Sequence, residues 1–212
     1  MEQNLKLNKG DEENLVDASS YRRLVGRLLY LQVTRPDIMY AVNVLSQFVS
    51  DPKQNHLDAT TRVLCYLKST PGQGILLPTD GGTDLTAYSD SDWLGCPFSR
   101  PEYQAMATTV SEVLWVLWLL TELDIRIDKP TPLFCDNELA RHISHNLVFH
   151  ERTKHVEMDC YFVRERVESK EVAPVWIDTR DLLADLLTKA LGSQRLHSLL
   201  IKLGIRNLHA PT

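Results

Sequence analysis

Four carboxylates lie at positions where a divalent-metal site could form. Asp90 ends the short stretch LTAYSD and Asp136 ends LFCD, and both stretches have the length and composition of β-strands. Glu102 opens the long apolar segment between them, and Asp185 lies in LADLLTK, beyond a third strand-like stretch. The carboxyl ends of strands line the ligand crevice of an open α/β sheet. The four acids could therefore meet there, although ordinary loop acids at strand ends are the alternative.

Carboxylate oxygens are ligands that favour Mg²⁺ or Mn²⁺ over zinc. Four carboxylates brought together would repel one another unless cations lay between them. Two such ions can activate a water molecule and stabilise a leaving oxygen during phosphodiester hydrolysis. Asp92 lies two residues after Asp90, on the same face of an extended strand, so the face alone does not separate the two acids.

Three helical patterns precede residue 70, and the first two have apolar residues spaced i, i+3, i+4 and i+7. They cover Tyr21–Leu29, Ile38–Val49 and His56–Lys68. In the third pattern the side chains expected to face inward are Leu57, Leu64 and Leu67. Residues 70–82, rich in proline and glycine, are expected to separate these helices from a second unit.

The second unit alternates strand and helix, which predicts parallel strands and an α/β layer fold. Its expected strands are 85–90, 133–136 and 172–177, and its expected helices are 102–123, 137–144, 149–168, 182–190 and a last one from Ser193. Gly204 is placed to end that last helix.

Composition and charge exclude several classes of protein. The chain has 212 residues and a net charge of −5, which excludes a wholly basic nucleic-acid coat. The four cysteines form no CxxC pair, so the sequence does not suggest a zinc site. The polar N-terminus is not a signal peptide, and the apolar run Val113–Leu120 is too short to span a bilayer. We therefore expect a protein of the cytoplasm or nucleus with no membrane partner.

Several ordered motifs resemble Ty1/copia-type retrotransposon polyproteins. SYRRLVGRLLYLQVTRPDIMYAVNVLSQF is similar to the segment that follows the reverse-transcriptase palm. AYSDSDWLG, EYQAMA, LFCDN, VFHERTKHVEMDCYFVRERV and LADLLTKAL resemble, in that order, the RNase H domain that follows it. Residues 1–15 are expected to form a flexible lead. The resemblance implies a helical thumb or connection segment over 16–78 and an RNase H-like domain over 83–212.

RNase H domains cut the RNA strand of an RNA–DNA hybrid with two Mg²⁺ (or Mn²⁺) ions held by four acids. By motif, the resemblance assigns catalysis and metal binding to Asp90, Glu102, Asp136 and Asp185, and it favours Asp90 over Asp92. The partner that it implies is an RNA–DNA hybrid, recognised by backbone shape and the 2′-hydroxyl groups. The palm and its catalytic aspartates are absent from this sequence, which excludes polymerase activity.

The chain departs from the family between Asp90 and Glu102. Only eleven residues separate the two acids, where family members carry a few dozen more, including the second and third strands of the sheet. The expected fold is therefore α/β and RNase H-like, with a truncated sheet of about three strands and a preceding helical segment. We expect impaired cleavage. The alternative is a non-catalytic remnant, retained by a host as a binding or regulatory protein.

Two further surfaces are candidates for binding. A basic cluster near the N-terminus, together with two residues near position 153, could contact a nucleic-acid backbone, although solvated helix faces are the alternative. The candidate residues are Arg22, Arg23, Arg27, Arg35, Arg152 and Lys154. The apolar run Val113–Leu120 predicts either a buried helix or an exposed patch around Trp115 and Trp118 that binds a protein partner.

Overall fold

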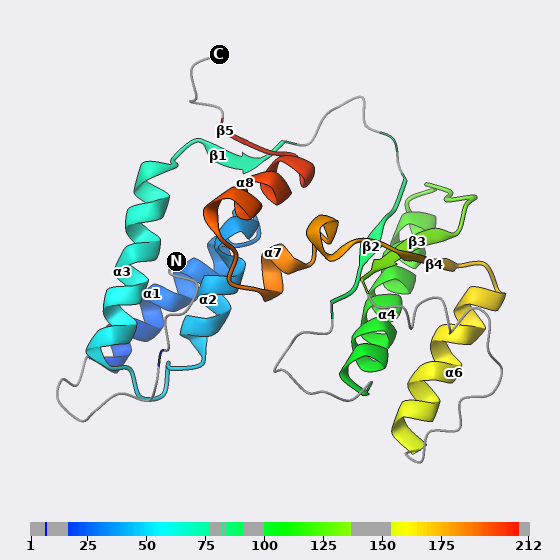
Figure 1. Ribbon diagram of the computed structural model, residues 1–212, viewed down its shortest axis with the longest axis horizontal. Helices are drawn as coiled ribbons and strands as arrows, with labels where there is room; N and C mark the ends of the chain where they lie inside the picture. The colour runs from blue at the N-terminus through cyan, green and yellow to red at the C-terminus, as the bar shows by residue number, and fades with distance from the viewer. Residues whose placement is uncertain are drawn as a thin grey trace. The chain divides into compact units, whose positions relative to one another are not determined.

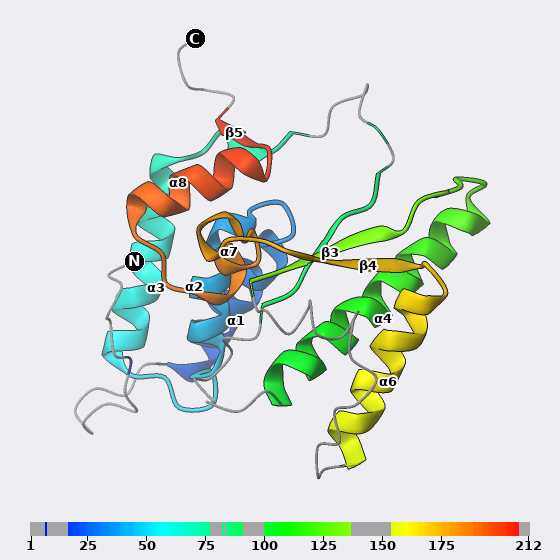
Figure 2. The same ribbon diagram turned by 45° about the vertical axis from the view of Figure 1, so that its right-hand side comes forward.

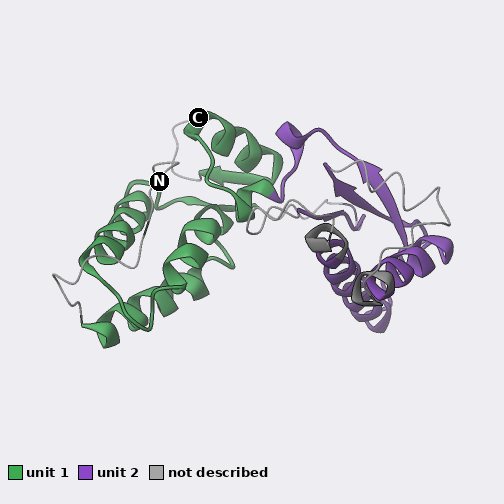
Figure 3. Cartoon of the chain, turned by 60° about the horizontal axis from the view of Figure 1, so that its bottom comes forward, with its two compact units in different colours: residues 1–78, 185–212 green, residues 79–184 purple. Residues whose placement is uncertain are grey.

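A computed structural model describes residues 7, 17–76, 82, 84–90, 100–136 and 154–207, without the side chains of residues 100–103 and 154–157. The chain forms two compact units (Figure 3). Unit 1 contains residues 1–78 and 185–212, and unit 2 contains residues 79–184. The second unit is thus inserted into the first.

Unit 1 is mainly helical (Figure 1). Its elements are α1 (Ala18–Leu31), the 3₁₀ turn η1 (Pro36–Ile38), α2 (Met39–Ser46), α3 (Gln54–Ser69), β1 (Gln73–Ile75), α7 (Asp185–Thr188), α8 (Ser193–Lys202) and β5 (Ile205–Asn207). Asp17 caps α1, since its carboxylate accepts hydrogen bonds from the Ser19 backbone at 2.9 Å and the Ser20 hydroxyl at 2.6 Å.

The core of unit 1 follows the helical pattern in the first two segments. The buried residues are Tyr21, Val25 and Leu28 of α1, Ile38, Val42 and Leu45 of the second segment, and Ala59 and Val63 of α3. Leu7, from the expected flexible lead, packs against this core, and the remainder of residues 1–15 lies outside the described residues.

The prediction of which side chains of α3 face inward was wrong for Leu64. Leu64 is 37% exposed, whereas His56 is completely buried and its ring stacks on Phe48 with 4.0 Å between ring centroids. The Nδ1 atom of His56 also accepts a hydrogen bond from the Lys53 backbone at the start of the helix. A polar residue that caps its own helix can thus replace a leucine in the core.

The carboxyl-terminal segment packs with the helices of unit 1, whereas the sequence analysis grouped it with the RNase H-like domain over 83–212. α7 packs against α2 and η1, and β5 pairs antiparallel with β1. Leu199 and Leu200 of α8 are buried, and Gly204 ends this helix region with a φ of +78°. The physical reason is that Leu199 and Leu200 on the apolar face of α8 leave water when the segment packs in the first unit.

Unit 2 contains a parallel sheet in the order β2–β3–β4. Its elements are β2 (Ala87–Tyr88), α4 (Arg100–Glu122), β3 (Thr131–Cys135), α6 (Lys154–Glu168), β4 (Val172–Trp176) and the 3₁₀ turn η2 (Thr179–Asp181). The fold of the chain is therefore mixed α and β, as expected. The predicted helix 137–144 lies outside the described residues.

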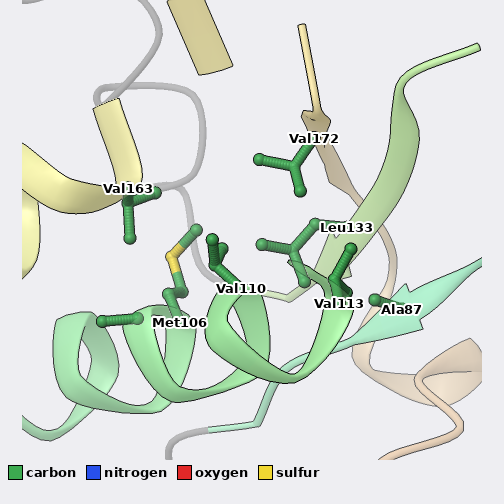
Figure 4. Packing of buried hydrophobic residues seen from close by; sticks show 8 residues of the cluster. Ala87, Met106, Val110, Val113, Leu133, Val163 and Val172 are labelled. Carbon is green, nitrogen blue, oxygen red and sulfur yellow. The ribbon is translucent and has the colours of Figure 1, made fainter. Parts of the chain in front are cut away.

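Helices α4 and α6 pack against each other (Figure 2). Figure 4 shows Met106, Val110 and Val113 of α4 together with Leu133 of β3 and Val163 of α6 in one buried cluster. This cluster fixes α4 against the sheet.

The opposite side of α4 is exposed. Trp115 and Trp118 are 56% and 60% exposed, whereas Val113 in the same run is buried. The run Val113–Leu120 is thus neither wholly buried nor wholly exposed. The longer span Gln104–Glu122 is long and apolar enough to cross a membrane by length and composition alone, although the same span supplies Met106, Val110 and Val113 to the core.

Candidate active site

Asp90 and Asp136 lie at the same edge of the sheet of unit 2. Tyr88 of β2 pairs with Phe134 of β3 in parallel register, and the Ser89 backbone N–H donates to the Phe134 carbonyl at 2.9 Å. Asp90 lies two residues after Tyr88, and Asp136 lies two residues after Phe134, so the two acids occupy equivalent positions. Because neighbouring strands are about 4.8 Å apart, these positions are adjacent.

The third strand contributes a hydrogen-bond donor to this edge. The Ile177 backbone N–H donates to the Cys135 carbonyl at 3.0 Å, which extends the pairing beyond β4. Two residues later, Thr179 begins η2, and its hydroxyl donates to Oδ2 of Asp136 at 2.9 Å. Asp178 caps the turn by accepting from the Arg180 backbone at 2.8 Å. The turn after β4 therefore orients one of the two carboxylates.

Sequence reasoning missed Thr179. The signal that could have identified it is its place in DTRD, directly after the third expected strand. A hydroxyl there can reach the end of the neighbouring parallel strand, because all three strands end at the same edge.

The other predicted acids have different surroundings. Glu102 lies in the first turns of α4, and its side chain is outside the description, as is Asp92. Asp185 belongs to unit 1 and is completely buried. Its carboxylate forms ion pairs with Lys189 Nζ at 2.8 Å and with Arg195 Nη2.

Two of the four acids thus fit a site for a hard cation. Asp90 and Asp136 follow two neighbouring strands at equivalent positions, and Mg²⁺ and Mn²⁺ prefer oxygen ligands. Within the described part of the chain, no group of three or more His, Cys, Asp or Glu side chains could hold a metal ion. The four-acid cluster stays a prediction.

The predicted basic residues divide into two groups. Arg22, Arg23 and Arg27 are exposed along α1. Arg35 is only 6% exposed, and its guanidinium donates to Asp37 at 2.7 and 2.9 Å and to Thr70 at 2.8 and 2.9 Å. Arg152 lies outside the described residues, and Lys154 begins α6 with its side chain outside the description.

The Arg35 guanidinium is part of a buried ionic network. Burial alone would lower the pKa of Arg35, but the hydrogen bonds and charge of Asp37 outweigh it, and the pKa is raised. Gln73 donates to both the Asp37 carboxylate and the Tyr66 hydroxyl, at 3.2 and 3.1 Å. Arg35 thus has a structural environment in unit 1, unlike the arginines of α1.

Comparisons with known proteins place the chain among retroelement proteins. It is 39% identical to the retrovirus-related Pol polyprotein from transposon RE1 and 38% identical to that from transposon RE2, both of Arabidopsis thaliana, over 94% of this chain. It is 31% identical over 80% of its length to the corresponding polyprotein from transposon TNT 1-94 of Nicotiana tabacum. No family model and no solved structure matches the chain.

The chain is a retroelement-derived protein, homologous to part of a Pol polyprotein from a retrotransposon. It spans about 16% of the length of the RE1 and RE2 polyproteins.

The alignments contain positions that this chain lacks. The RE1 alignment has 231 positions, but 94% of 212 residues is about 199, so about 32 positions of RE1 have no counterpart here. For TNT 1-94 the alignment has 203 positions against about 170 residues, a difference of about 33. In the aligned region, both relatives are thus longer than this chain by nearly the same number of residues.

Proposed function

We propose that the chain derives from the C-terminal part of a Ty1/copia-type Pol polyprotein, and joins a connection-like helical segment to an RNase H-like domain. Its ancestral activity is two-metal cleavage of the RNA strand in RNA–DNA hybrids, and that activity is impaired here. The observation that carries the proposal is the placement of Asp90 and Asp136 at equivalent positions beyond two neighbouring parallel strands.

The impairment follows from a shortened sheet. About 32 positions of RE1 have no counterpart in this chain. This number agrees with the few dozen residues that we expect to be missing between Asp90 and Glu102. The strand β2 has only two residues, and its described pairing is with β3 alone. A short strand at a sheet edge holds the residue that follows it less firmly than a strand paired on both sides, because fewer backbone hydrogen bonds restrain it.

Three residues at the sheet edge would have different roles in metal binding. Asp90 and Asp136 would supply carboxylate oxygens, and Thr179 would hold the Asp136 carboxylate in one orientation through its 2.9 Å hydrogen bond. Bound Mg²⁺ would supply activation of water and neutralisation of charge at the phosphate. Glu102 is a further ligand by resemblance. The resemblance also assigns Asp185 to this set, although its described ion pairs are with Lys189 and Arg195.

The substrate is an RNA–DNA hybrid, and α1 is the described surface best suited to its phosphates. Arg22, Arg23 and Arg27 are exposed within one and a half turns of this helix. Arginine side chains contribute sequence-independent affinity by contacting phosphate oxygens. Arg152 and Lys154 are additional candidates on the segment that leads into α6.

The decisive experiment measures cleavage of an RNA–DNA hybrid with Mg²⁺ by the full chain and two variants. Asp136→Asn removes a proposed ligand, whereas Asp128→Asn is a matched control, because Asp128 is exposed and precedes β3 at the opposite end of the strand. We expect slow cleavage by the parent chain and by Asp128→Asn, and none by Asp136→Asn. Equal cleavage by all three proteins, or none by the folded parent chain, would overturn the proposal.

A second candidate function is protein binding by a non-catalytic remnant. The observation that favours it is the exposure of Trp115 and Trp118 on α4, since large aromatic side chains are enriched at protein interfaces. Affinity capture with the parent chain and with Trp118→Lys would test it. A set of captured proteins that the substitution leaves unchanged counts against a partner at this patch.

A further inference from the structure

We propose that Asp185 is a buried ionic anchor that ties α7 to α8 within the carboxyl-terminal segment, the segment that packs onto the helices of unit 1, and that it is not a metal ligand. The resemblance assigns Asp185 to the metal site, but its described contacts are those of a structural ion pair. The inference that Asp185 does not bind Mg²⁺ rests on the proposed function. The anchoring role of Asp185 does not depend on that function.

The contacts of Asp185 account for both carboxylate oxygens. Oδ1 lies 2.8 Å from Lys189 Nζ, one turn further along, and Oδ2 pairs with Arg195 Nη2 of α8. The carboxylate has no exposed surface, and the Lys189 and Arg195 side chains are 20% and 34% exposed. Because the two cations come from successive helices, one carboxylate ties α7 to α8.

The carboxyl-terminal segment that contains Asp185 packs against the first helices of unit 1. Leu186, next to Asp185, is 2% exposed, and Leu199 of α8 is completely buried. Residues of the segment and of η1, α2 and α3 line a small pocket of about 120 Å³, among them Ile38, Val63 and Leu196. Beside this pocket, α7 of the segment packs against α2 and η1.

The other end of the segment is held by backbone hydrogen bonds. β5 pairs antiparallel with β1, with Ile205 opposite Ile75 and Asn207 opposite Gln73. This short ladder joins the two chain segments of unit 1, whereas the ion pairs at Asp185 lie within the carboxyl-terminal segment and link α7 to α8. Loss of the ion pairs would leave Lys189 and Arg195 without this carboxylate, and α7 and α8 would be held by their apolar contacts and this ladder.

The same contacts disfavour a divalent cation at Asp185. Two positive side chains already lie against its oxygens, and they would repel Mg²⁺ at that distance. A metal ion would have to displace both of them and break the link between α7 and α8. The geometry thus assigns Asp185 to the fold of unit 1 and leaves the sheet edge at Asp90 and Asp136 as the place for a cation.

The test is hydrogen exchange, resolved by segment, on the full chain and on Asp185→Asn. Truncating one partner of a buried ion pair strongly destabilises the surrounding structure. We expect exchange in α2 and α8 to speed up by about 100-fold or more, with β3 in unit 2 unchanged. Asp136→Asn is the matched carboxylate control and should leave unit 1 exchange unchanged. Unchanged exchange in α2 and α8 of Asp185→Asn would overturn the anchoring role.

A second variant keeps the inference testable if Asp185→Asn does not fold. Lys189→Met removes one cation and keeps the carboxylate with Arg195, so unit 1 should exchange faster while Mg²⁺ affinity, measured by calorimetry, stays that of the parent chain. If Asp185 were a metal ligand, removal of this competing cation would instead tighten Mg²⁺ binding. A parent chain that binds no Mg²⁺ contradicts the proposed function but leaves the exchange experiment as the test of the anchor.

Discussion

The hydroxyl of Thr179 donates a hydrogen bond of 2.9 Å to Oδ2 of Asp136, across 43 positions of sequence. Thr179 follows β4 and Asp136 follows β3, and the two strands pair in parallel over five residues each. The hydrogen bond therefore joins the ends of two neighbouring strands at the edge that carries Asp90. It makes the orientation of one carboxylate depend on the turn η2.

Substitution of Thr179 tests this orientation. Thr179→Val keeps the size of the side chain but removes the donor, so the Asp136 carboxylate loses a restraint, and we expect the Mg²⁺ half-saturation concentration for hybrid cleavage to rise about threefold to tenfold. Thr179→Ser keeps the hydroxyl and should resemble the parent chain. Equal half-saturation for the valine and serine variants would show that the hydrogen bond does not matter for the site.

The buried pair of Arg35 and Asp37 predicts a large effect on stability. Arg35→Met would leave the Asp37 carboxylate buried without its cation, and we expect the free energy of unfolding to fall by about 3–5 kcal/mol. Arg22→Met on the exposed face of α1 is the control and should change it by about 0.5 kcal/mol or less. Urea unfolding, followed by a probe in unit 1, measures both. Similar values for the two variants would contradict a structural role of Arg35.

The three exposed arginines of α1 predict a change in salt dependence. Replacing Arg22, Arg23 and Arg27 together with glutamine should weaken hybrid binding at low salt. The slope of log K against log salt concentration should fall by about one for each arginine that pairs with a phosphate in the parent complex. Fluorescence anisotropy over a range of KCl concentrations measures this slope. An unchanged slope would show that α1 does not bind the phosphates.

The tyrosine of the buried network predicts alkaline instability. Burial raises the pKa of Tyr66 above its usual value of 10.0, and the nearby charge of Asp37 raises it further. The folded chain therefore holds the phenol proton more tightly than the unfolded chain does. This contribution to stability is complete below pH 10 and is lost as the pH rises through the raised pKa.

Tyr66→Phe removes the titrating group, so the decline in unfolding free energy above pH 10 should be shallower than in the parent chain. Tyr30→Phe is the matched control, because Tyr30 is 84% exposed. Urea unfolding at a series of alkaline pH values measures both. The interpretation fails if the two variants lose stability with the same pH dependence.

The helices with a clear apolar period were predicted well. Tyr21, Val25 and Leu28 are buried as expected, because apolar side chains on one face of a helix leave water together when that face packs against the core. The α3 segment shows the limit of this reasoning. Leu64 is 37% exposed and His56 is buried, because the neighbouring Phe48 ring and the Lys53 backbone offer the imidazole better contacts.

The candidate site was predicted in part. The acids at the ends of two strand-like stretches were found from sequence, and the structure places Asp90 and Asp136 at equivalent positions. The donor from Thr179 was missed, and Arg35 was grouped with exposed arginines although it is buried. Both features depend on neighbours 35 or more positions away, which local patterns do not contain.

The sequence by itself determined the retroelement ancestry, the helices of the first segment and the strand ends that carry acids. These features follow from local residue types, whose periods and motifs can be read without neighbours. Only the tertiary structure decided that residues 185–212 close the helical unit and that Asp185 pairs with Lys189 and Arg195. The reason is that a short amphipathic helix can pack on any suitable apolar face. A carboxylate can likewise bind a metal ion or form an ion pair with lysine or arginine. The choice is made by which partners the folded chain brings within reach.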